Sequence, residues 1–298
     1  LGARSPTEVE VRVPATVANL GPGFDCLGVA LGVHLRLRVS PAASEEAPPP
    51  NRNLTHRSFA EAFGATGRRA PPVSVQVLES YPSARGMGAS ASAIVAGLVA
   101  ARLMGELEMS DQELARLAIE IEGHPDNVVP ALLGGLVLCS GQTWMRLEPH
   151  PGVSPLVLVA RERFKTVEAR RALPAEVPRA DAVANAAALS ALVMALTGLE
   201  PPTALMLATE DRIHEPYRLA LMHETADLHA VLRAKGVPTA LAGAGPSLIC
   251  LVETRSLEGC TRLARERLPE GWQAISPGWD LLGAQARPLT SADVGLEH

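Results

Sequence analysis

The segment Pro82-Ser83-Ala84-Arg85-Gly86-Met87-Gly88-Ala89-Ser90-Ala91-Ser92 runs directly into a stretch of mostly apolar residues at 93–101. Before it, residues 73–77 alternate between valine and polar side chains, which predicts the order strand, glycine-rich loop, helix. Gly86 and Gly88 allow the backbone to approach a ligand closely, and the helix adds the positive end of its dipole. The loop is therefore predicted to bind phosphate, with the Ser90 hydroxyl as a candidate Mg²⁺ ligand. The alternative is a tight turn in which Ser90 only caps the helix.

The composition around this loop is that of an ordinary globular protein. Of the 298 residues, 47% are hydrophobic and 20% are charged, and the length suggests two domains. A net charge of −5 and an aromatic content of 3% argue against a nucleic-acid partner. No run of residues approaches the roughly 18 consecutive apolar residues of a membrane span, so no membrane partner is expected.

Other nucleotide-binding motifs and metal motifs are absent from the sequence. There is no Gly-Lys-Ser/Thr, which excludes a Walker A loop, and no Gly-x-Gly-x-x-Gly follows a strand, which disfavours a Rossmann oxidoreductase. The four cysteines, Cys26, Cys139, Cys250 and Cys260, lack C-x-x-C spacing and are expected to be reduced thiols. Charged residues precede the first apolar run, so no secretory signal is expected and a cytoplasmic location is predicted.

The patterns along the rest of the chain predict an α+β protein with two domains. Strands are predicted at residues 9–13, 31–39, 73–77, 156–159 and 248–252. In the first half, helices are predicted at 53–63, over the apolar run 93–101 that follows the glycine-rich loop, and from a capping box at Ser110–Glu113 to Gly123. In the second half they are predicted at 181–197, 203–213 and 217–234. The stretch of proline and glycine around residues 147–155 predicts a boundary between domains at 1–150 and 151–295. Residues 296–298 look like the start of a histidine tag.

Four segments together resemble the GHMP kinases, and within them the homoserine kinase branch. The loop at 82–92 resembles the family's second motif, with Met87 and Ala89 as departures and Ser90 retained. The first motif of that branch is matched by residues 14–28 (PATVANLGPGFDCLG), and a further segment of it by residues 122–135 (EGHPDNVVPALLGG). The family's third motif is matched by residues 243–247 (GAGPS). The resemblance runs from about Val11 to Arg287. It implies an N-terminal domain like domain 2 of ribosomal protein S5, with a left-handed crossover, and a ferredoxin-like C-terminal domain.

The resemblance also implies a reaction: ATP and L-homoserine give ADP and O-phospho-L-homoserine, a step toward threonine, catalysed by a homodimer. L-homoserine is a zwitterion, so its pocket needs an acidic or amide group for the ammonium and arginine for the carboxylate. By resemblance, Asn19 and Asp25 take the ammonium, and Arg170 and Arg218 take the carboxylate. His124 lines the same pocket, and Thr166 lies near the reacting groups. Without the resemblance, Asp25 is a turn residue, His124 a helix end, and both arginines are surface charges.

The remaining assignments concern ATP, the metal and the base. The loop at 82–92 is assigned to ATP. Glu122 borders small residues at the edge of an apolar helical stripe, so Glu122 is predicted to bind Mg²⁺ with Ser90, and Glu120 is the alternative. Asp126 falls near the catalytic aspartate of mevalonate kinase-like members and is the candidate base, although the homoserine branch manages without a clear base. Asn53 lies where the family contacts adenine, and a helix N-cap is the alternative for it.

Two other functions stay open at this point. A GHMP-type kinase for another small alcohol would lack the two pairs assigned to the ammonium and the carboxylate. A non-catalytic ATP-binding protein on the same fold would be expected to lose Ser90 or both glutamates. All of these residues are present, so phosphorylation of homoserine is the preferred interpretation.

Overall fold

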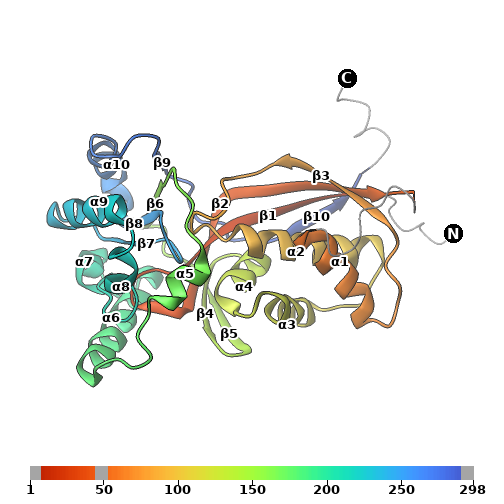
Figure 1. Ribbon diagram of the computed structural model, residues 1–298, viewed down its shortest axis with the longest axis horizontal. Helices are drawn as coiled ribbons and strands as arrows, with labels where there is room; N and C mark the ends of the chain where they lie inside the picture. Colours follow the sequence, from red (N-terminus) through yellow and green to blue (C-terminus); the bar gives the residue numbers. More distant parts are fainter. Residues whose placement is uncertain (1–7, 44–52, 290–298) are drawn as a thin grey trace.

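Two antiparallel sheets organise the chain, one in each half of the molecule (Figure 1). The computed structural model describes residues 8–43 and 53–289. The first sheet has the order β10-β1-β2-β4-β5, with β3 also paired to β2. Its strands are β1 (Val9–Asn19), β2 (Gly23–Pro41), β3 (Val73–Glu79), β4 (Leu136–Ser140), β5 (Thr143–Leu147) and β10 (Gln285–Pro288). The second sheet has the order β7-β8-β6-β9, made of β7 (Thr239–Leu241), β8 (Leu248–Glu253), β6 (Val153–Val159) and β9 (Gln273–Ile275).

Four helices cover one face of the first sheet (Figure 1). They are α1 (Leu54–Ala65), α2 (Ala89–Met104), α3 (Asp111–Glu122) and α4 (Pro125–Leu133). The predicted capping box is present, because Ser110 and Glu113 each accept a hydrogen bond from the other's backbone N–H, and Gly123 ends α3 with a positive φ of 96°. Most of α2 is buried, and its small side chains let α1 pack closely against it.

The β1–β2 hairpin joins the two halves. Strands were predicted only at 9–13 and 31–39. In the structure the first strand continues to Asn19, and the second already begins at Gly23. The central part of β1 is buried on both faces, so the alternation of apolar and polar residues that marks a strand stops at Val13. Val9, Val11 and Val13 pack under the four helices, whereas Val17 and Leu20 pack in a second core with the other sheet. The hairpin therefore carries its tip, residues 19–25, into the C-terminal half.

The second sheet is covered on both faces. In β8, Ile249 and Leu251 face the hairpin and α6 (Arg179–Thr197), whereas Leu248 and Cys250 face α9 (His223–Ala234) and α10 (Leu257–Arg265). This arrangement explains the continuous apolar run that predicted the strand. The remaining helical segments are α5 (Thr166–Arg171), α7 (Leu205–Ala208), α8 (Glu215–Leu219) and two 3₁₀ turns, Pro202–Ala204 and Thr254–Ser256.

Two helix predictions in the C-terminal half were wrong. The helix predicted at 203–213 is only a 3₁₀ turn followed by the four residues of α7, because the Asp211 carboxylate accepts two backbone N–H groups that begin α8. The helix predicted at 217–234 is divided into α8 and α9 by a turn at residues 220–222. Pro216, in the first turn of α8, is compatible with a new helix start there.

The chain passes from the first sheet to the second between β5 and β6, within the stretch 147–155. It returns to the first sheet as β10, which pairs with β1, so residues 285–288 belong to the N-terminal sheet. The tag prediction at 296–298 lies outside the described residues, as do the start of the first predicted domain and the end of the second. The two-domain α+β fold is confirmed.

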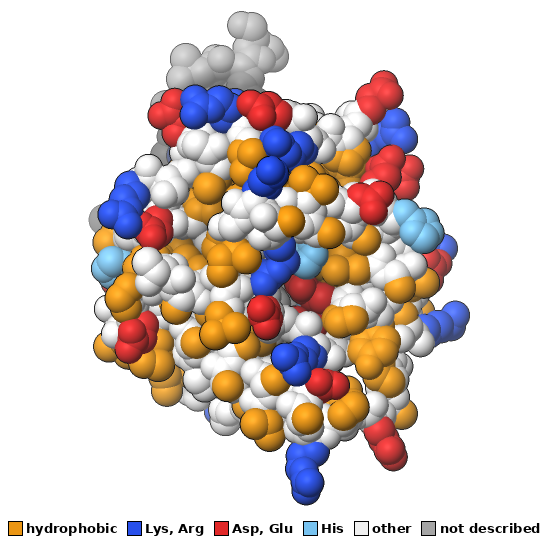
Figure 2. All heavy atoms as spheres, turned by 90° about the vertical axis from the view of Figure 1, so that its left-hand side faces the viewer, with side chains coloured by type: hydrophobic (Ala, Val, Ile, Leu, Met, Phe, Trp, Pro, Cys, Tyr) orange, Lys and Arg blue, Asp and Glu red, His pale blue; other side chains and the backbone are white. Residues whose placement is uncertain are grey.

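Helix α6 is, within residues 8–43 and 53–289, the one helix long and apolar enough to cross a bilayer by length and composition. A single helix of this kind is weak evidence for a membrane span, and 22% of its apolar window is buried in the protein. Leu192 and Leu196 on its inner side pack in the second core. Figure 2 shows that hydrophobic and charged side chains are intermingled over the end of the molecule that carries the C-terminal helices.

Candidate active site

One cleft of about 340 Å³ lies where the two halves meet. Six segments line it: the hairpin tip, the glycine-rich loop, the junction of α3 and α4, helix α5 with the loop before it, helix α8, and the turn after β7. All nine side chains predicted to bind substrate or to act in catalysis face this cleft: Asn19, Asp25, Ser90, Glu122, His124, Asp126, Thr166, Arg170 and Arg218. They come from both halves, so the cleft depends on the packing of the hairpin tip into the C-terminal half.

The glycine-rich loop forms one wall. Gly86 and Gly88 have φ values of 79° and 65°, and a Cβ at Gly86 would lie 1.9 Å from the Ala242 carbonyl oxygen. Only glycine fits such a close approach. Gly88 occupies the N-cap position of α2 and has no side chain to accept a hydrogen bond. The first N–H groups of α2 therefore have no side-chain cap at the cleft wall. An uncapped helix N-terminus beside a cleft is suited to bind an anion such as phosphate.

Ser90 and Glu122 meet at this wall. The Ser90 hydroxyl donates a hydrogen bond of 2.7 Å to Glu122 Oε2, joining the start of α2 to the end of α3. Burial is the main factor that raises the pKa of Glu122, and the nearby Asp126 raises it further, while the Ser90 hydroxyl acts in the opposite direction. Glu120 is exposed and does not line the cleft. Two adjacent hard oxygen donors, one of them a carboxylate, fit Mg²⁺, which keeps its other positions for phosphate and water.

The start of α4 places a second carboxylate deep in the cleft. Asp126 is 3% exposed, and burial, together with the negative charge of Asp25, raises its pKa to about 6. His124, two residues earlier, has its pKa lowered by burial and by the positive charge of Arg170. Asn127 accepts a hydrogen bond of 2.9 Å from the Thr16 hydroxyl, which ties α4 to β1. The lining of the cleft therefore includes three carboxyl groups, Asp25, Glu122 and Asp126, together with the guanidinium groups of Arg170 and Arg218.

The opposite wall consists of amide and charged side chains. Asn19 has a φ of 74°; its amide donates to the Gly243 carbonyl at 2.8 Å and its side-chain oxygen accepts the Asp25 N–H at 3.0 Å. The Asp25 carboxylate receives two hydrogen bonds of 3.1 Å from Arg170. Arg218 is 2% exposed, and its guanidinium lies 5.1 Å from the centre of the Phe24 ring. Cationic, anionic and amide groups thus face one another across a few ångströms.

Several residues assigned to ATP lie outside this wall. Of the loop, Ser83, Ala84 and residues 86–90 line the cleft, whereas Pro82, Arg85, Ala91 and Ser92 do not. Ala91 is in the core, the Ser92 hydroxyl donates to the Pro14 carbonyl, and Arg85 binds the Arg161 carbonyl at 2.6 Å. Asn53 does not line the cleft: it is the N-cap of α1, and its side chain accepts the His56 N–H. The structure thus gives Asn53 the alternative role that the sequence left open.

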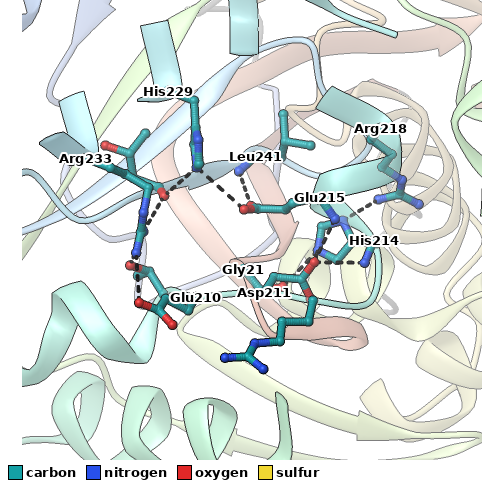
Figure 3. A network of polar contacts seen from close by, with 12 residues as sticks. Gly21, Glu210, Asp211, His214, Glu215, Arg218, His229, Arg233 and Leu241 are labelled. Carbon is teal, nitrogen blue, oxygen red and sulfur yellow. Dashed lines mark hydrogen bonds and ion pairs between the residues drawn. The ribbon is translucent and has the colours of Figure 1, made fainter. Parts of the chain in front are cut away.

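Some residues that line the cleft were not identified from the sequence. Asn127, Phe164, Ala18 and residues 243–245 face the cleft but were given no role. Asn127 and residues 243–245 lie inside motifs that were noted, so their place in those motifs was the available signal. No pattern around Phe164 marks it, because its position depends on the path of the loop between β6 and α5. The polar groups behind Arg218 were missed as well (Figure 3).

Comparisons with known proteins agree with this geometry. Residues 53–135 match the model of the GHMP kinases N terminal domain. The homoserine kinase of Streptomyces avermitilis is 40% identical over 95% of this chain and 97% of its own, and that of Thermosynechococcus vestitus is 42% identical over 81% and 85%. The crystal structure of homoserine kinase from Cytophaga hutchinsonii has a TM-score of 0.86 at 22% identity, covering 96% of this chain and 99% of that one.

The structural neighbour shares the fold, and the sequence relatives extend that likeness over nearly the whole chain at a level of identity where family membership is certain. Both walls of the cleft, the glycine-rich loop and the cluster of oppositely charged side chains, lie within the part of the chain that aligns with the Streptomyces avermitilis enzyme. The chain belongs to the homoserine kinase family of the GHMP kinases.

Proposed function

We propose that this protein transfers the γ-phosphate of ATP to the hydroxyl of L-homoserine, giving O-phospho-L-homoserine and ADP. The observation that carries the proposal is that one cleft holds a phosphate-type loop on one wall and groups for a zwitterion on the other. The relatives named homoserine kinase, about 40% identical over most of the chain, support the same reaction.

The loop wall takes the nucleotide. Backbone N–H groups of the loop and the start of α2 bind the phosphates, because Gly86 and Gly88 keep side chains out of the way. Ser90 and Glu122 hold Mg²⁺ through their oxygens. When bound there, the ion neutralises charge on the phosphates. The base of ATP is not assigned to Asn53, whose side chain is engaged in capping α1.

The opposite wall takes the amino acid. Asn19 and Asp25 bind the ammonium, and Arg170 and Arg218 bind the carboxylate. An amino acid that enters between Asp25 and Arg170 exchanges their mutual ion pair for its own two charges, so no charged group is left without a partner. The side chain of the substrate then extends toward the loop wall, past Thr166 and Asp126.

Phosphoryl transfer has a loose transition state, so positioning and charge neutralisation account for most of the acceleration. Asp126 is the carboxyl group that can accept the hydroxyl proton, because a pKa of about 6 leaves it mostly ionised at neutral pH and still moderately basic. Thr166 and His124 hold the hydroxyl end of the substrate. The expected homodimer, cytoplasmic location and place in threonine synthesis remain predictions.

The test is release of ADP from Mg-ATP in the presence of L-homoserine, compared with L-serine, L-threonine and mevalonate. We expect turnover with homoserine that exceeds the others by at least about 100-fold. Serine and threonine place the hydroxyl one carbon closer to the charged groups, which misaligns it for transfer, and mevalonate lacks the ammonium, which leaves the acidic and amide groups assigned to it without that partner. Equal turnover with mevalonate, which has no ammonium group, would contradict the assignment of Asn19 and Asp25. Absence of turnover with homoserine while ATP still binds would overturn the proposed reaction.

A further inference from the structure

We propose that His214 is a positioning residue that fixes Arg218 and the hairpin tip relative to each other, and so sets the site for the substrate carboxylate. The inference rests on the proposed function for the identity of that carboxylate. His214 lies at the start of α8 and is fully buried, with 0% exposure. It does not line the cleft, but it contacts Arg218, which does (Figure 3).

The imidazole of His214 joins the two halves of the molecule. Its Nε2 lies 2.8 Å from the Gly21 carbonyl oxygen in the hairpin tip, and its Nδ1 lies 3.2 Å from Arg218 Nη1. The ring also stacks on Phe24, with ring centres 5.2 Å apart and an interplanar angle of 26°. The residue that precedes α8 therefore contacts both the hairpin tip and the arginine assigned to the carboxylate.

These contacts determine where the imidazole carries its hydrogen. A guanidinium has only donors, so Nδ1 of His214 accepts from Arg218. Nε2 then carries the hydrogen and donates it to the Gly21 carbonyl. In this tautomer both ring nitrogens are satisfied and the ring is neutral. The Asp211 carboxylate fixes the backbone at the same place, since it accepts the N–H groups of His214 at 2.8 Å and Glu215 at 2.7 Å.

The contact with His214 orients the guanidinium of Arg218 so that its remaining N–H groups suit a carboxylate. Its Nη1 is held by His214 and by the Gly243 carbonyl at 3.2 Å. Its Nε is buried and has no hydrogen-bond partner in the described part of the chain. The edge formed by Nε and Nη2 matches a carboxylate, which guanidinium groups bind through two parallel hydrogen bonds. His214 therefore selects which edge of Arg218 remains for the substrate.

The hairpin tip depends on the same ring. Gly21 lies between Asn19 and Asp25, the two residues assigned to the ammonium, and a second anchor, Asn185, donates to the Pro22 carbonyl at 3.1 Å. Since α8 has only five residues, its side chains need such external contacts to stay in place. Loss of the His214 contacts would release Arg218 and weaken the hold on the tip, at the amino-acid end of the cleft only.

The chain offers a matched control in His229. It belongs to the same polar network, where its Nε2 lies 3.1 Å from the Thr239 carbonyl and 3.6 Å from a Glu215 carboxylate oxygen (Figure 3). Within the described part of the chain, it forms no hydrogen bond or ion pair with Arg218 or with the hairpin tip, and it is outside the cleft lining. A variant of His229 therefore perturbs the network without touching the proposed connection.

The kinetic test compares three variants. His214→Phe keeps the aromatic packing against Phe24 and removes both hydrogen bonds, so we expect the KM for homoserine to rise about 30-fold or more while the KM for ATP stays within about twofold. His214→Asn places an oxygen near the position of Nδ1 and should recover the homoserine KM to within about fivefold of the wild type. His229→Phe should leave the homoserine KM unchanged. Equal effects of His214→Phe on both KM values, or an equal rise in His229→Phe, would overturn the proposal.

A spectroscopic test does not depend on turnover. Nitrogen NMR of the histidine rings should show His214 as the neutral Nε2–H tautomer, with an Nδ1 resonance that moves in Arg218→Met. An Nδ1–H tautomer, or an Nδ1 resonance indifferent to Arg218→Met, would overturn the proposal even if His214→Phe failed to fold. If the wild type does not phosphorylate homoserine but the resonance behaves as expected, the proposed reaction fails while the positioning of Arg218 by His214 stands.

Discussion

Asp25 and Arg170 form a two-pronged ion pair across the mouth of the cleft, with Arg170 Nη1 and Nη2 each 3.1 Å from a different oxygen of the Asp25 carboxylate. Asp25 comes from the hairpin tip with a positive φ of 55°, and Arg170 comes from α5 in the other half. The sequence assigned these two side chains to opposite ends of a zwitterion. Their contact holds both side chains in place, and the proposed function requires an amino acid to replace it with contacts to its own charges.

The first prediction concerns the ammonium end. Asp25→Asn removes the negative charge and leaves Arg170 without its ionic partner, so we expect the KM for homoserine to rise about 10- to 100-fold. The KM for ATP should change by less than about twofold, because the phosphate loop lies on the other wall. Steady-state kinetics with each substrate varied in turn measures both values.

The matched control is Asp111→Asn, which also breaks an ion pair between a carboxylate and an arginine. Asp111 Oδ1 lies 2.6 Å from Arg102 Nη1, but its side chain is 61% exposed and lies away from the cleft. Exposed pairs of this kind contribute about 1 kcal/mol or less. An unchanged homoserine KM in Asp25→Asn would show that this carboxylate does not bind the ammonium.

The second prediction separates the two glutamates of α3. Glu122 accepts the Ser90 hydrogen bond and faces the cleft, whereas Glu120 is exposed. We expect Glu122→Gln to lower kcat by about 100-fold or more and to raise the Mg²⁺ concentration needed for half-maximal activity, because the ion loses its anionic ligand. Glu120→Gln is the control and should behave as the wild type in the same Mg²⁺ titration. A larger loss of kcat in Glu120→Gln than in Glu122→Gln would instead assign the Mg²⁺ ligand to Glu120.

Much of the fold and part of the site could be predicted from local patterns. The glycine-rich loop and the capping box of α3 follow from local patterns. The substrate residues among the nine, such as Asp25 and Arg170, were assigned only by their resemblance to the motifs of a known family. The strand ends could not be predicted in the same way, because β1 is buried on both faces beyond Val13 and loses its alternation. The helix predicted at 203–213 was wrong because propensity alone does not reveal that the Asp211 side chain captures the backbone.

The polar groups behind the site were beyond local reasoning for a related reason. His214 and Gly21 are 193 residues apart in the chain, and Asp25 and Arg170 are 145 apart. Only the insertion of the hairpin tip into the C-terminal half brings them together, and no single window of sequence contains both partners. The return of the chain as β10 is missed for the same reason, since its pairing partner β1 is near the other end of the sequence.

The third prediction concerns Asn53. Its side chain accepts the His56 N–H at 3.0 Å as the N-cap of α1. Asn53→Ala should therefore lower the free energy of unfolding by about 1 kcal/mol, the usual cost of losing such a cap, and leave the KM for ATP unchanged. Asn53→Asp keeps an acceptor at the cap and should restore the stability. A raised ATP KM in Asn53→Ala with normal stability would instead support a contact with adenine.

The last prediction concerns the pH dependence of stability. Burial and the charge of Asp25 raise the pKa of Asp126 from its ordinary 3.8 to about 6, so ionising this group favours the unfolded chain. The stability associated with its protonated form is fully present below the unfolded pKa and is lost as the pH rises through about 6. Asp126→Asn removes the ionisation, and we expect it to raise the free energy of unfolding at pH 7.5 by on the order of 2–3 kcal/mol.

At pH 3.5, below the ordinary pKa of 3.8, the carboxyl group of Asp126 is protonated in the folded protein and mostly protonated in the unfolded chain, so most of the gain should disappear. Urea denaturation at several pH values measures the difference, and Asp111→Asn, whose carboxylate is exposed, should show no comparable gain at pH 7.5. The same Asp126→Asn variant should lose most of its kinase activity, because the proposed function uses this carboxylate to accept the hydroxyl proton. A variant that is less stable than the wild type at pH 7.5 would mean that the ionised carboxylate is satisfied within the fold, and would remove the physical argument for Asp126 as the proton acceptor.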